Sequence, residues 1–404
     1  MKTKLKVAVY AITKDEEKFV QRWYDSMKYA DYIIVMDTGS TDNTIEKFKS
    51  LEDGIAYNNE KDCYTNGHLF IYSKIIIPWH FGVARQTSLE LCPEDTDIYV
   101  STDLDEFFEQ DDWIEILKSK WNPEIHERAV YKYSWSHNKD GSSARIFHYN
   151  KIHNKDWIWK YPVHELLCHK TRKNEGYDSS RCCYLFNEIH LHHFPDKTKP
   201  RTQYLPLLEA RAEEDPNDYY GLIYLAHEYT YRQMYQKSID TLNKILAKFN
   251  DKMTNIEKAS CYLFIGDAYR SLLAINKETK DKNNVNLESL SASSYFLSMN
   301  IEPTYREAYL GIAKLYLDKN DYEKSIFYAK ESLKNGVRHY TWLERDHSWT
   351  YEPYDILSLA YYYSGNKMTS LSYAVKALSY DKENERLKNN VDVILSNTSD
   401  KDFI

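Results

Sequence analysis

Two carboxylates separated by one residue, Asp103 and Asp105, lie a few residues after the apolar run 98–100. Carboxylates held this close repel each other unless a cation joins them. A divalent metal ion that also binds a diphosphate would neutralise both the carboxylates and a phosphate leaving group. Most acids between residues 86 and 117 are expected to form a solvated face, but this pair predicts a divalent metal site that can also hold a diphosphate.

Other side chains suited to a phosphate or a metal lie far away in the sequence. Arg85 is the only arginine between Arg22 and Arg128, and it is either a phosphate ligand or a charge on the surface of a helix. The chain also offers three late histidines, whose imidazoles suit Mn²⁺ as well as carboxylate does. These are His190, His192 and His193.

The pattern of apolar residues predicts the elements that position these side chains. Residues 5–12 and 32–36 are expected to be strands, and residues 16–29 and 43–51 helices. This alternation predicts a mixed, mainly parallel α/β sheet of Rossmann-like form, which binds ligands at the carboxyl ends of its strands. The first domain should cover residues 1–200. Further strands are predicted at 97–101, 129–135, 143–149 and 184–192.

From about residue 203 the pattern becomes helix after helix, with small residues recurring twelve positions apart. Small side chains let the two helices of a hairpin approach closely. The spacing resembles the tetratricopeptide repeat, with an insertion at 277–286, and a plain α-helical bundle is the alternative. Residues 201–404 would then form a scaffold, a partner surface or an acceptor platform. The aligned positions are Ala226, Ala313 and Ala360 with Ser238, Ser325 and Ser372, and Ala268 heads a divergent fourth unit.

The first 200 residues contain a succession of segments that resembles family-2 glycosyltransferases of the GT-A fold. The soluble branch of that family includes lipopolysaccharide-core glucosyltransferases. The layout of two domains is similar to that of peptide S-glycosyltransferases that modify bacteriocins. The resemblance implies an α/β GT-A domain followed by an all-α domain of tetratricopeptide-like repeats. It rests on residues 9–16, 37–44, 81–85 and 103–106, and on Arg145–Phe147, Trp159 and Val163–Glu165.

The resemblance also implies roles for the residues that follow the first strands. Thr13, Asp15 and Asp37 would bind the base and ribose of a UDP-sugar, and Arg85 would lie near its diphosphate. Bound Mn²⁺ or Mg²⁺ is expected.

Asp103, Leu104 and Asp105 would form the DXD motif of the family. Asp105 would be the direct metal ligand, and Asp103 would reach the ribose or a metal-bound water. His193 would be the third ligand, since the family often uses a late histidine, or else a hydrogen-bonded residue at the domain junction. His190 and His192 share one face of a predicted strand and are better structural candidates.

Inverting sugar transfer needs a general base for the acceptor. Glu165 falls where the acceptor loop of the family carries its base, and His164 is the neighbouring alternative. The sequence lacks the Glu-Asp pair that many members have there, and Glu165 could instead form a salt bridge with Arg145.

Aromatic and basic residues are concentrated before Glu165. Aromatic faces stack on sugar rings, so at least one of the rings is expected in an acceptor cleft, although clustered tryptophans are more often core. The basic stretch 139–173 could meet an anionic acceptor or balance the acids before it. The aromatic candidates are Trp135, His137, Trp157, Trp159 and Tyr161.

Composition narrows the class of protein. The chain has 404 residues, with 53 basic and 61 acidic side chains, and a net charge of −8 disfavours a protein that coats nucleic acid or anionic membranes. Six cysteines without a CxxC pair indicate neither a disulfide framework nor a zinc ribbon. No window approaches the roughly 20 apolar residues of a membrane span. We therefore expect a cytoplasmic enzyme.

The expected activity is transfer of a hexose, with glucose the first candidate, from a UDP-sugar to a peptide, protein or saccharide. Two alternatives stay open: transfer to a modified base in DNA, and a non-catalytic tetratricopeptide scaffold with a decayed transferase domain. Homo-oligomers could form through the helical repeats.

Overall fold

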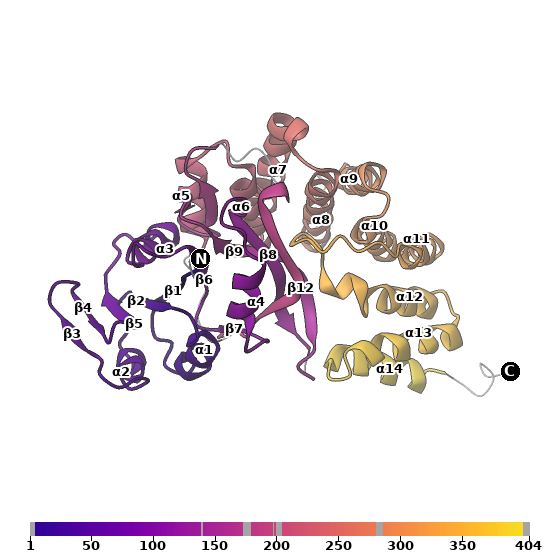
Figure 1. Ribbon diagram of the computed structural model, residues 1–404. Coiled ribbons are helices and arrows are strands. Elements are labelled where there is room, and N and C mark those ends of the chain that lie inside the picture. Colours follow the sequence, from indigo (N-terminus) through magenta and orange to yellow (C-terminus); the bar gives the residue numbers. More distant parts are fainter. Residues whose placement is uncertain are drawn as a thin grey trace. The chain divides into compact units, whose positions relative to one another are not determined.

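The chain forms two compact units, Met1–Glu214 and Asp215–Ile404, in the computed structural model (Figure 1). The structure describes residues 5–138, 140–172, 179–196, 198, 204–279 and 286–398. Residues 139 and 173 of the basic stretch and residues 280–285 of the insertion lie outside these ranges.

The first unit extends beyond residue 200 because helix α5 (Tyr204–Glu214) is tied to it. The guanidinium of Arg211 is fully buried and donates hydrogen bonds to the carbonyl oxygens of Val163 at 2.9 Å and His164 at 2.6 Å. It also stacks on the ring of Tyr161. A helix anchored in this way belongs to the sheet unit.

A ten-stranded sheet forms the framework of the first unit, in the order β3-β4-β5-β2-β1-β6-β9-β8-β12-β7. The alternation of elements had predicted a mainly parallel sheet, and this prediction is wrong. Among the described residues, five of the nine neighbouring pairs are antiparallel, because β8 and β9 form a hairpin and short strands flank the parallel set. The strands are β1 (Val7–Thr13), β2 (Tyr32–Asp37), β3 (Ala56–Asn58), β4 (Cys63–Thr65), β5 (Leu69–Ser73), β6 (Ile98–Ser101), β7 (Glu106–Phe108), β8 (Arg128–His137), β9 (Ser143–His153) and β12 (Cys182–His193), and a separate pair is formed by β10 (Trp157–Lys160) and β11 (Leu166–His169).

Alternating side chains of β1 divide the core into two layers. Val7 and Val9 pack with residues of α1, α2 and α4, whereas Ala8 and Tyr10 pack with residues of α3 and of the β10–β11 pair. Figure 1 shows α1 and α2 on one side of the sheet and α3 on the other. The sheet is therefore covered on both faces, as a buried parallel strand requires. The helices are α1 (Val20–Met27), α2 (Thr44–Lys49), α3 (Phe81–Glu90) and α4 (Trp113–Lys120).

The three central strands β1, β2 and β6 are parallel neighbours and end at the same edge. Thr13 is the register partner of Asp37, and Tyr10 is the partner of Ser101. The loops after these strands therefore share one edge of the sheet. All the candidate nucleotide ligands except Arg85 lie in or directly before these loops.

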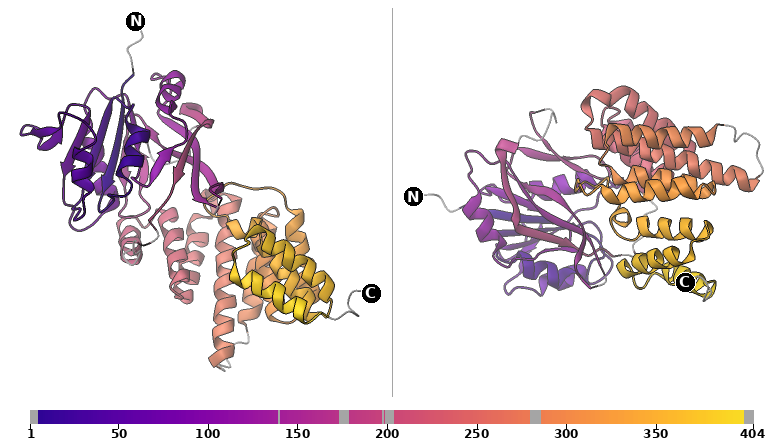
Figure 2. Two further views of the ribbon diagram at one scale, coloured as in Figure 1. Left: turned by 90° about the horizontal axis from the view of Figure 1, so that it is seen from below. Right: turned by 90° about the vertical axis from the view of Figure 1, so that its right-hand side faces the viewer.

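Antiparallel pairs of helices form most of the described part of the second unit (Figure 2). This region is therefore a helical repeat region, as the recurring small residues had predicted. The pairs are α6 (Tyr219–Tyr231) with α7 (Tyr235–Phe249), α8 (Asn255–Thr279) with α9 (Leu287–Ile301), α10 (Arg306–Asp318) with α11 (Tyr322–Lys334), and α12 (Glu352–Tyr363) with α13 (Lys367–Tyr380), followed by α14 (Glu385–Ser396).

The crossing points of the hairpins correct the predicted register at two of the four units. The Ser238 hydroxyl donates to the carbonyl of Ala226 at 2.8 Å, as expected. In the last hairpin, however, Ser370 donates to Ser358, also at 2.8 Å, and the predicted Ser372 is exposed. The α8–α9 crossing uses Gly266 rather than Ala268, with the hydroxyl of Ser291 donating to its carbonyl.

The cause of the two-residue error is visible in the burial of the side chains. Ala268 and Ala360 are also small and fully buried, so they satisfied the same pattern.

A non-repetitive segment, residues 336–351, separates α11 from α12 and contacts the first helices of the three preceding hairpins. We call it the connecting segment. The ring of Trp342 stacks on Tyr224 of α6 at 4.4 Å between centroids. Arg345 forms a 2.7 Å ion pair with Asp267 of α8. The segment therefore joins helices that are distant in sequence.

None of the helices in the described part of the chain has the length and apolar character needed to cross a bilayer.

Candidate active site

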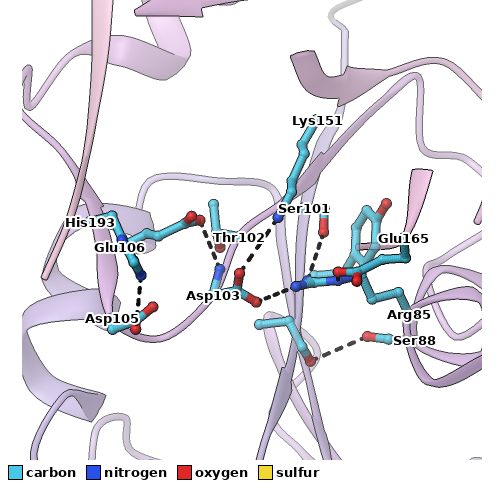
Figure 3. Close-up of polar contacts among 12 residues, drawn as sticks. Arg85, Ser88, Ser101, Thr102, Asp103, Asp105, Glu106, Lys151, Glu165 and His193 are labelled. Atoms are coloured by element: carbon cyan, nitrogen blue, oxygen red, sulfur yellow. Dashed lines mark hydrogen bonds and ion pairs between the residues drawn. The ribbon is translucent and has the colours of Figure 1, made fainter. Parts of the chain in front are cut away.

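Arg85 of α3 joins two carboxylates, that of Asp103 after β6 and that of Glu165 directly before β11 (Figure 3). Its Nε lies 2.5 Å from Oε1 of Glu165, and its Nη2 lies 2.6 Å from Oδ1 of Asp103. The residue is only 5% exposed, so it is not a charge on the surface of a helix. Burial works to lower the pKa of Arg85, but the two carboxylates hold it well above its usual value.

Asp103 has a second cation, Lys151 of β9, whose Nζ lies 3.5 Å from Oδ2. Burial opposes ionisation of Asp103, yet Arg85 and Lys151 hold its pKa well below the usual range. The sequence placed Lys151 only in a long basic stretch. The signal that could have found it is the alternation along β9, which puts Lys151 on the same face as Tyr149 and His153.

Asp105 meets His193 on the other side of the loop. Oδ2 of Asp105 is 3.3 Å from Nε2 of His193, while Nδ1 of that ring hydrogen-bonds the Trp135 carbonyl at 3.1 Å. A backbone partner on one nitrogen leaves the other to a metal, which is the usual arrangement of a metal-binding histidine. Burial alone would lower the pKa of His193, but the contact with Asp105 raises it overall.

Of the three predicted metal ligands, only two therefore lie next to each other. Asp105 and His193 are adjacent, whereas the oxygens of Asp103 face Arg85 and Lys151. Leu104, between the two aspartates, is a buried core residue. One carboxylate and one imidazole fit a divalent ion whose remaining ligands come from water and a diphosphate.

Glu106 is a fully buried carboxyl that the sequence did not single out beyond its place in the motif. Its Oε1 accepts from the hydroxyl of Tyr133 at 2.8 Å, and its Oε2 accepts from the backbone N–H of Asp103 at 2.9 Å. Burial, helped by the charge of Asp103, raises the pKa of Glu106 to about 7. Its location next to a charged loop could be inferred from sequence, but its burial could not.

Glu106→Gln tests this raised pKa. Between pH 4.5, the ordinary value, and about 7 the folded protein keeps a proton that the unfolded chain loses, so stability should fall as pH rises through that window. The free energy of unfolding of the variant should lack this fall. The difference in that free energy between the variant and the wild type should therefore shift in favour of the variant by on the order of 2 kcal/mol from pH 5 to pH 8. Urea denaturation across pH measures it, with the exposed Glu115→Gln as control. Parallel curves for wild type and Glu106→Gln would contradict the assignment.

The predicted nucleotide ligands support each other's loops. The carboxylate of Asp37 accepts from the backbone N–H groups of Gly39 and Ser40 at 3.1 Å. Oδ1 of Asp15 accepts from the backbone N–H of Thr41 at 2.6 Å, and this bond is the main cause that lowers its pKa. The buried hydroxyl of Thr13 has no hydrogen-bond partner among the described residues. The loops after β1 and β2 are therefore held together by their own polar groups.

The loop 161–165, which contains the predicted base Glu165, connects β10 to β11 in an unusual backbone conformation. Tyr161 and His164 have positive φ angles of 76° and 47°, which cost free energy for residues other than glycine. His164 is exposed. Burial works to raise the pKa of Glu165, but Arg85 and then Lys151 lower it overall. The cation that Glu165 contacts is Arg85, where the sequence had suggested Arg145.

Gly82 fixes this loop against the start of α3. Its N–H donates to the Tyr161 carbonyl at 3.0 Å, and a Cβ at this position would lie 2.5 Å from that same oxygen. Gly82→Ala should therefore displace the loop and destabilise the protein by about 2 kcal/mol. Chemical denaturation measures the loss. Gly336→Ala is the matched control, because no heavy atom lies within 4 Å of its Cβ position, and an equal effect of both variants would contradict the role of Gly82.

Only one of the predicted sugar-stacking rings is exposed beside the charged residues. Trp159 is buried and donates its Nε1–H to Tyr10 at 2.8 Å, and Tyr161 lies beneath Arg211. Trp135 is 39% exposed, with its ring centroid 4.8 Å from that of His193. Of the five candidates, Trp135 is the ring that a ligand at this edge could reach.

No protein-family model matches the chain, and no curated protein matches it at a significant level. Among solved structures it is similar to TTC0263, a thermophilic TPR protein of Thermus thermophilus, with 18% identity and a TM-score of 0.39 over 48% of this chain and 89% of that one. MamA matches with 16% identity and a TM-score of 0.32 over 45% and 89% of the two chains. YrrB, a TPR protein with an unusual peptide-binding site, matches with 12% identity and a TM-score of 0.31 over 46% and 80%.

Proposed function

We propose that the chain is a metal-dependent glycosyltransferase with a GT-A-type first unit, which transfers a hexose from a UDP-sugar to a peptide, protein or saccharide. The observation that carries the proposal is the arrangement after β6. Asp105 with His193 lies on one side of the loop and Asp103 with Arg85 on the other. Such a loop can place a metal ion and a guanidinium around one diphosphate, which stabilises it as a leaving group.

Asp105 and His193 are the residues that would hold the metal ion, Mn²⁺ or Mg²⁺. When bound, the ion would neutralise charge on the departing diphosphate. The imidazole of His193 favours Mn²⁺, since Mg²⁺ prefers oxygen ligands. The loops of Thr13, Asp15 and Asp37 end at the same sheet edge and are proposed to bind the base and ribose.

Arg85 is proposed to exchange partners when the donor binds. In the structure it neutralises Asp103 and Glu165. A diphosphate is a stronger partner for a guanidinium than a single carboxylate, because it offers more oxygens and charge. Its arrival would release Glu165, whose carboxylate could then accept a proton from the acceptor nucleophile.

The acceptor is proposed to approach past Trp135, whose exposed ring can stack on a sugar. The helical hairpins offer a surface for a peptide or protein, while the resemblance of the first unit favours a saccharide. A net charge of −8 disfavours a DNA acceptor, because phosphate contacts need an excess of basic residues.

Calorimetric titration with UDP, with and without Mn²⁺, tests the donor site. We expect saturable binding that requires the metal. Binding of UDP that is equally strong without metal, or no binding by the folded protein, would contradict the proposal.

Glu165→Gln separates the two roles open to this residue. If Glu165 is the general base, turnover of a UDP-sugar should fall by at least about 100-fold while UDP binding is retained. If it only positions Arg85, UDP affinity should fall together with turnover. Unchanged turnover would exclude both roles.

A non-catalytic repeat scaffold is the second candidate function. The observation that favours it is that Arg85, Asp103 and Glu165 already satisfy one another inside the protein, as residues of a purely structural ion network do. The UDP titration distinguishes the two functions, because a scaffold would bind neither UDP nor the metal with it.

A further inference from the structure

A second group of metal-ligand side chains lies on the face of β12 opposite to His193. Side chains alternate along a strand, so His190 and His192 point away from the face of His193. Glu109 follows the edge strand β7, and its backbone N–H donates to the His190 carbonyl at 2.9 Å. Among the described residues, these three form the one group of ligand atoms that all lie within 4.8 Å of one another.

The distances suit a small metal ion. Oε2 of Glu109 is 2.7 Å from Nδ1 of His190 and 3.2 Å from Nε2 of His192. In a tetrahedral zinc site with bonds of 2.0–2.1 Å, neighbouring ligand atoms are about 3.3 Å apart. The exposed carboxylate of Glu109 therefore has to move by only about half an ångström to make room for an ion.

The outer nitrogen of each imidazole already has a partner. Nε2 of His190 lies 2.6 Å from the hydroxyl of Ser134, and Nδ1 of His192 lies 2.8 Å from Nε2 of His137. Metal-binding histidines use such outer contacts to fix the orientation of the ring. The ring of His137 is itself stacked on Phe194 at 3.9 Å. Both imidazoles are thus held with their inner nitrogens toward Glu109.

The group combines two largely shielded imidazoles with access for an ion. The side chains of His190 and His192 are 11% and 13% exposed, whereas Glu109 is 56% exposed. The two imidazoles are therefore largely shielded, while an ion can reach the site from solvent at Glu109.

We propose that Glu109, His190 and His192 bind a divalent transition-metal ion, with Zn²⁺ the expected one, which clips the edge strand β7 to β12. Two nitrogen ligands and one oxygen ligand suit Zn²⁺ and disfavour Ca²⁺ and Mg²⁺. Solvent reaches the site at Glu109, so water completes the coordination. The site is separate from Asp105 and His193 and does not depend on the proposed function.

The test uses the full-length chain with Asp105→Ala as parent, so that the ligand pair on the other face is removed. After treatment with a chelator, the parent is titrated with Co²⁺ and followed by visible absorption, and then with Zn²⁺ by calorimetry. We expect one equivalent of Co²⁺ to produce the visible absorption bands of a nitrogen-ligated cobalt ion. Zn²⁺ should displace the bound Co²⁺ and abolish these bands.

Added to this parent, His190→Gln and His192→Gln should each lower Zn²⁺ affinity by about 100-fold or more. His148→Gln, an exposed histidine of the same sheet, should leave it unchanged. Glu109→Gln replaces an exposed side chain, so it keeps the fold even if a histidine variant does not, and it should weaken binding as well. The proposal would be overturned if the folded parent showed no saturable binding of Co²⁺ or Zn²⁺. It would also be overturned if all three ligand variants bound Zn²⁺ as tightly as the parent does.

Discussion

Asp105→Ala is expected to abolish metal-dependent UDP binding, with a loss of affinity of at least about 100-fold. The carboxylate is one of two adjacent donor groups, and a single imidazole cannot hold a divalent ion against water. The variant should fold, because the contacts of Asp105 with Arg22 and Phe194 use its backbone carbonyl. Calorimetry with UDP and Mn²⁺ measures the loss.

The matched control is Asp111→Ala, an exposed acid a few residues further along the chain. It should bind UDP like the wild type. The stability of Asp105→Ala without UDP should fall by about 1–3 kcal/mol, because the contact of Asp105 with His193 is largely shielded from solvent. Wild-type UDP affinity in Asp105→Ala would exclude this residue as a metal ligand.

Arg85→Met is expected to destabilise the protein by about 3–5 kcal/mol at pH 7, which is the largest stability effect that we expect from one substitution. It leaves the carboxylates of Asp103 and Glu165 without their shared cation. Removing one partner of a buried ion pair costs more than the pair contributes, because the remaining charge is desolvated. The midpoint of urea denaturation at constant slope measures it.

The difference in stability between Arg85→Met and the wild type should become smaller as the pH is lowered. The wild-type pKa values of Asp103 and Glu165 are lowered, so their contribution is present above the unfolded values of 3.8 and 4.5 and is lost as pH falls. In the variant, burial without Arg85 favours the protonated carboxyls.

The variant Arg85→Met with Asp103→Asn and Glu165→Gln is the internal control. It should recover part of the stability, because neutral amides replace the unpaired charges. A loss below about 1 kcal/mol for Arg85→Met alone would contradict the buried bridge.

The order of strands and helices at the start of the chain could be predicted because apolar residues recur at different spacings in the two kinds of element. The side chains of the run Val7–Thr13 alternate between two buried layers, while Val20, Trp23 and Met27 recur at helical spacing. Whether two strands pair in parallel or antiparallel leaves no such pattern in the sequence. The β8–β9 hairpin and the short strands β3 to β5 depend on turns and on partners elsewhere, so the sheet was expected to be more parallel than it is.

In the candidate site, too, local features could be predicted from the sequence and long-range contacts could not. Strand alternation correctly separated His190 and His192 from His193, because it is a local property. Which carboxylates Arg85 would meet depends on how α3 packs on the sheet, and no pattern within α3 reports this. The group formed by Glu109 with His190 and His192 was missed because β7 has only three residues and its pairing with β12 is long-range.

The connecting segment 336–351 has a consequence for the way in which the second unit unfolds. Arrays of hairpins that contact only their neighbours behave as one-dimensional chains and can fray from either end. Here Trp342 holds α6, Arg345 holds α8, and the carbonyl of Leu343 accepts from the Tyr305 hydroxyl, directly before α10. Opening any of these hairpins disturbs the same segment, so the loss of one weakens the others. The segment therefore converts a linear array into a cooperative block in which the first three hairpins are lost together.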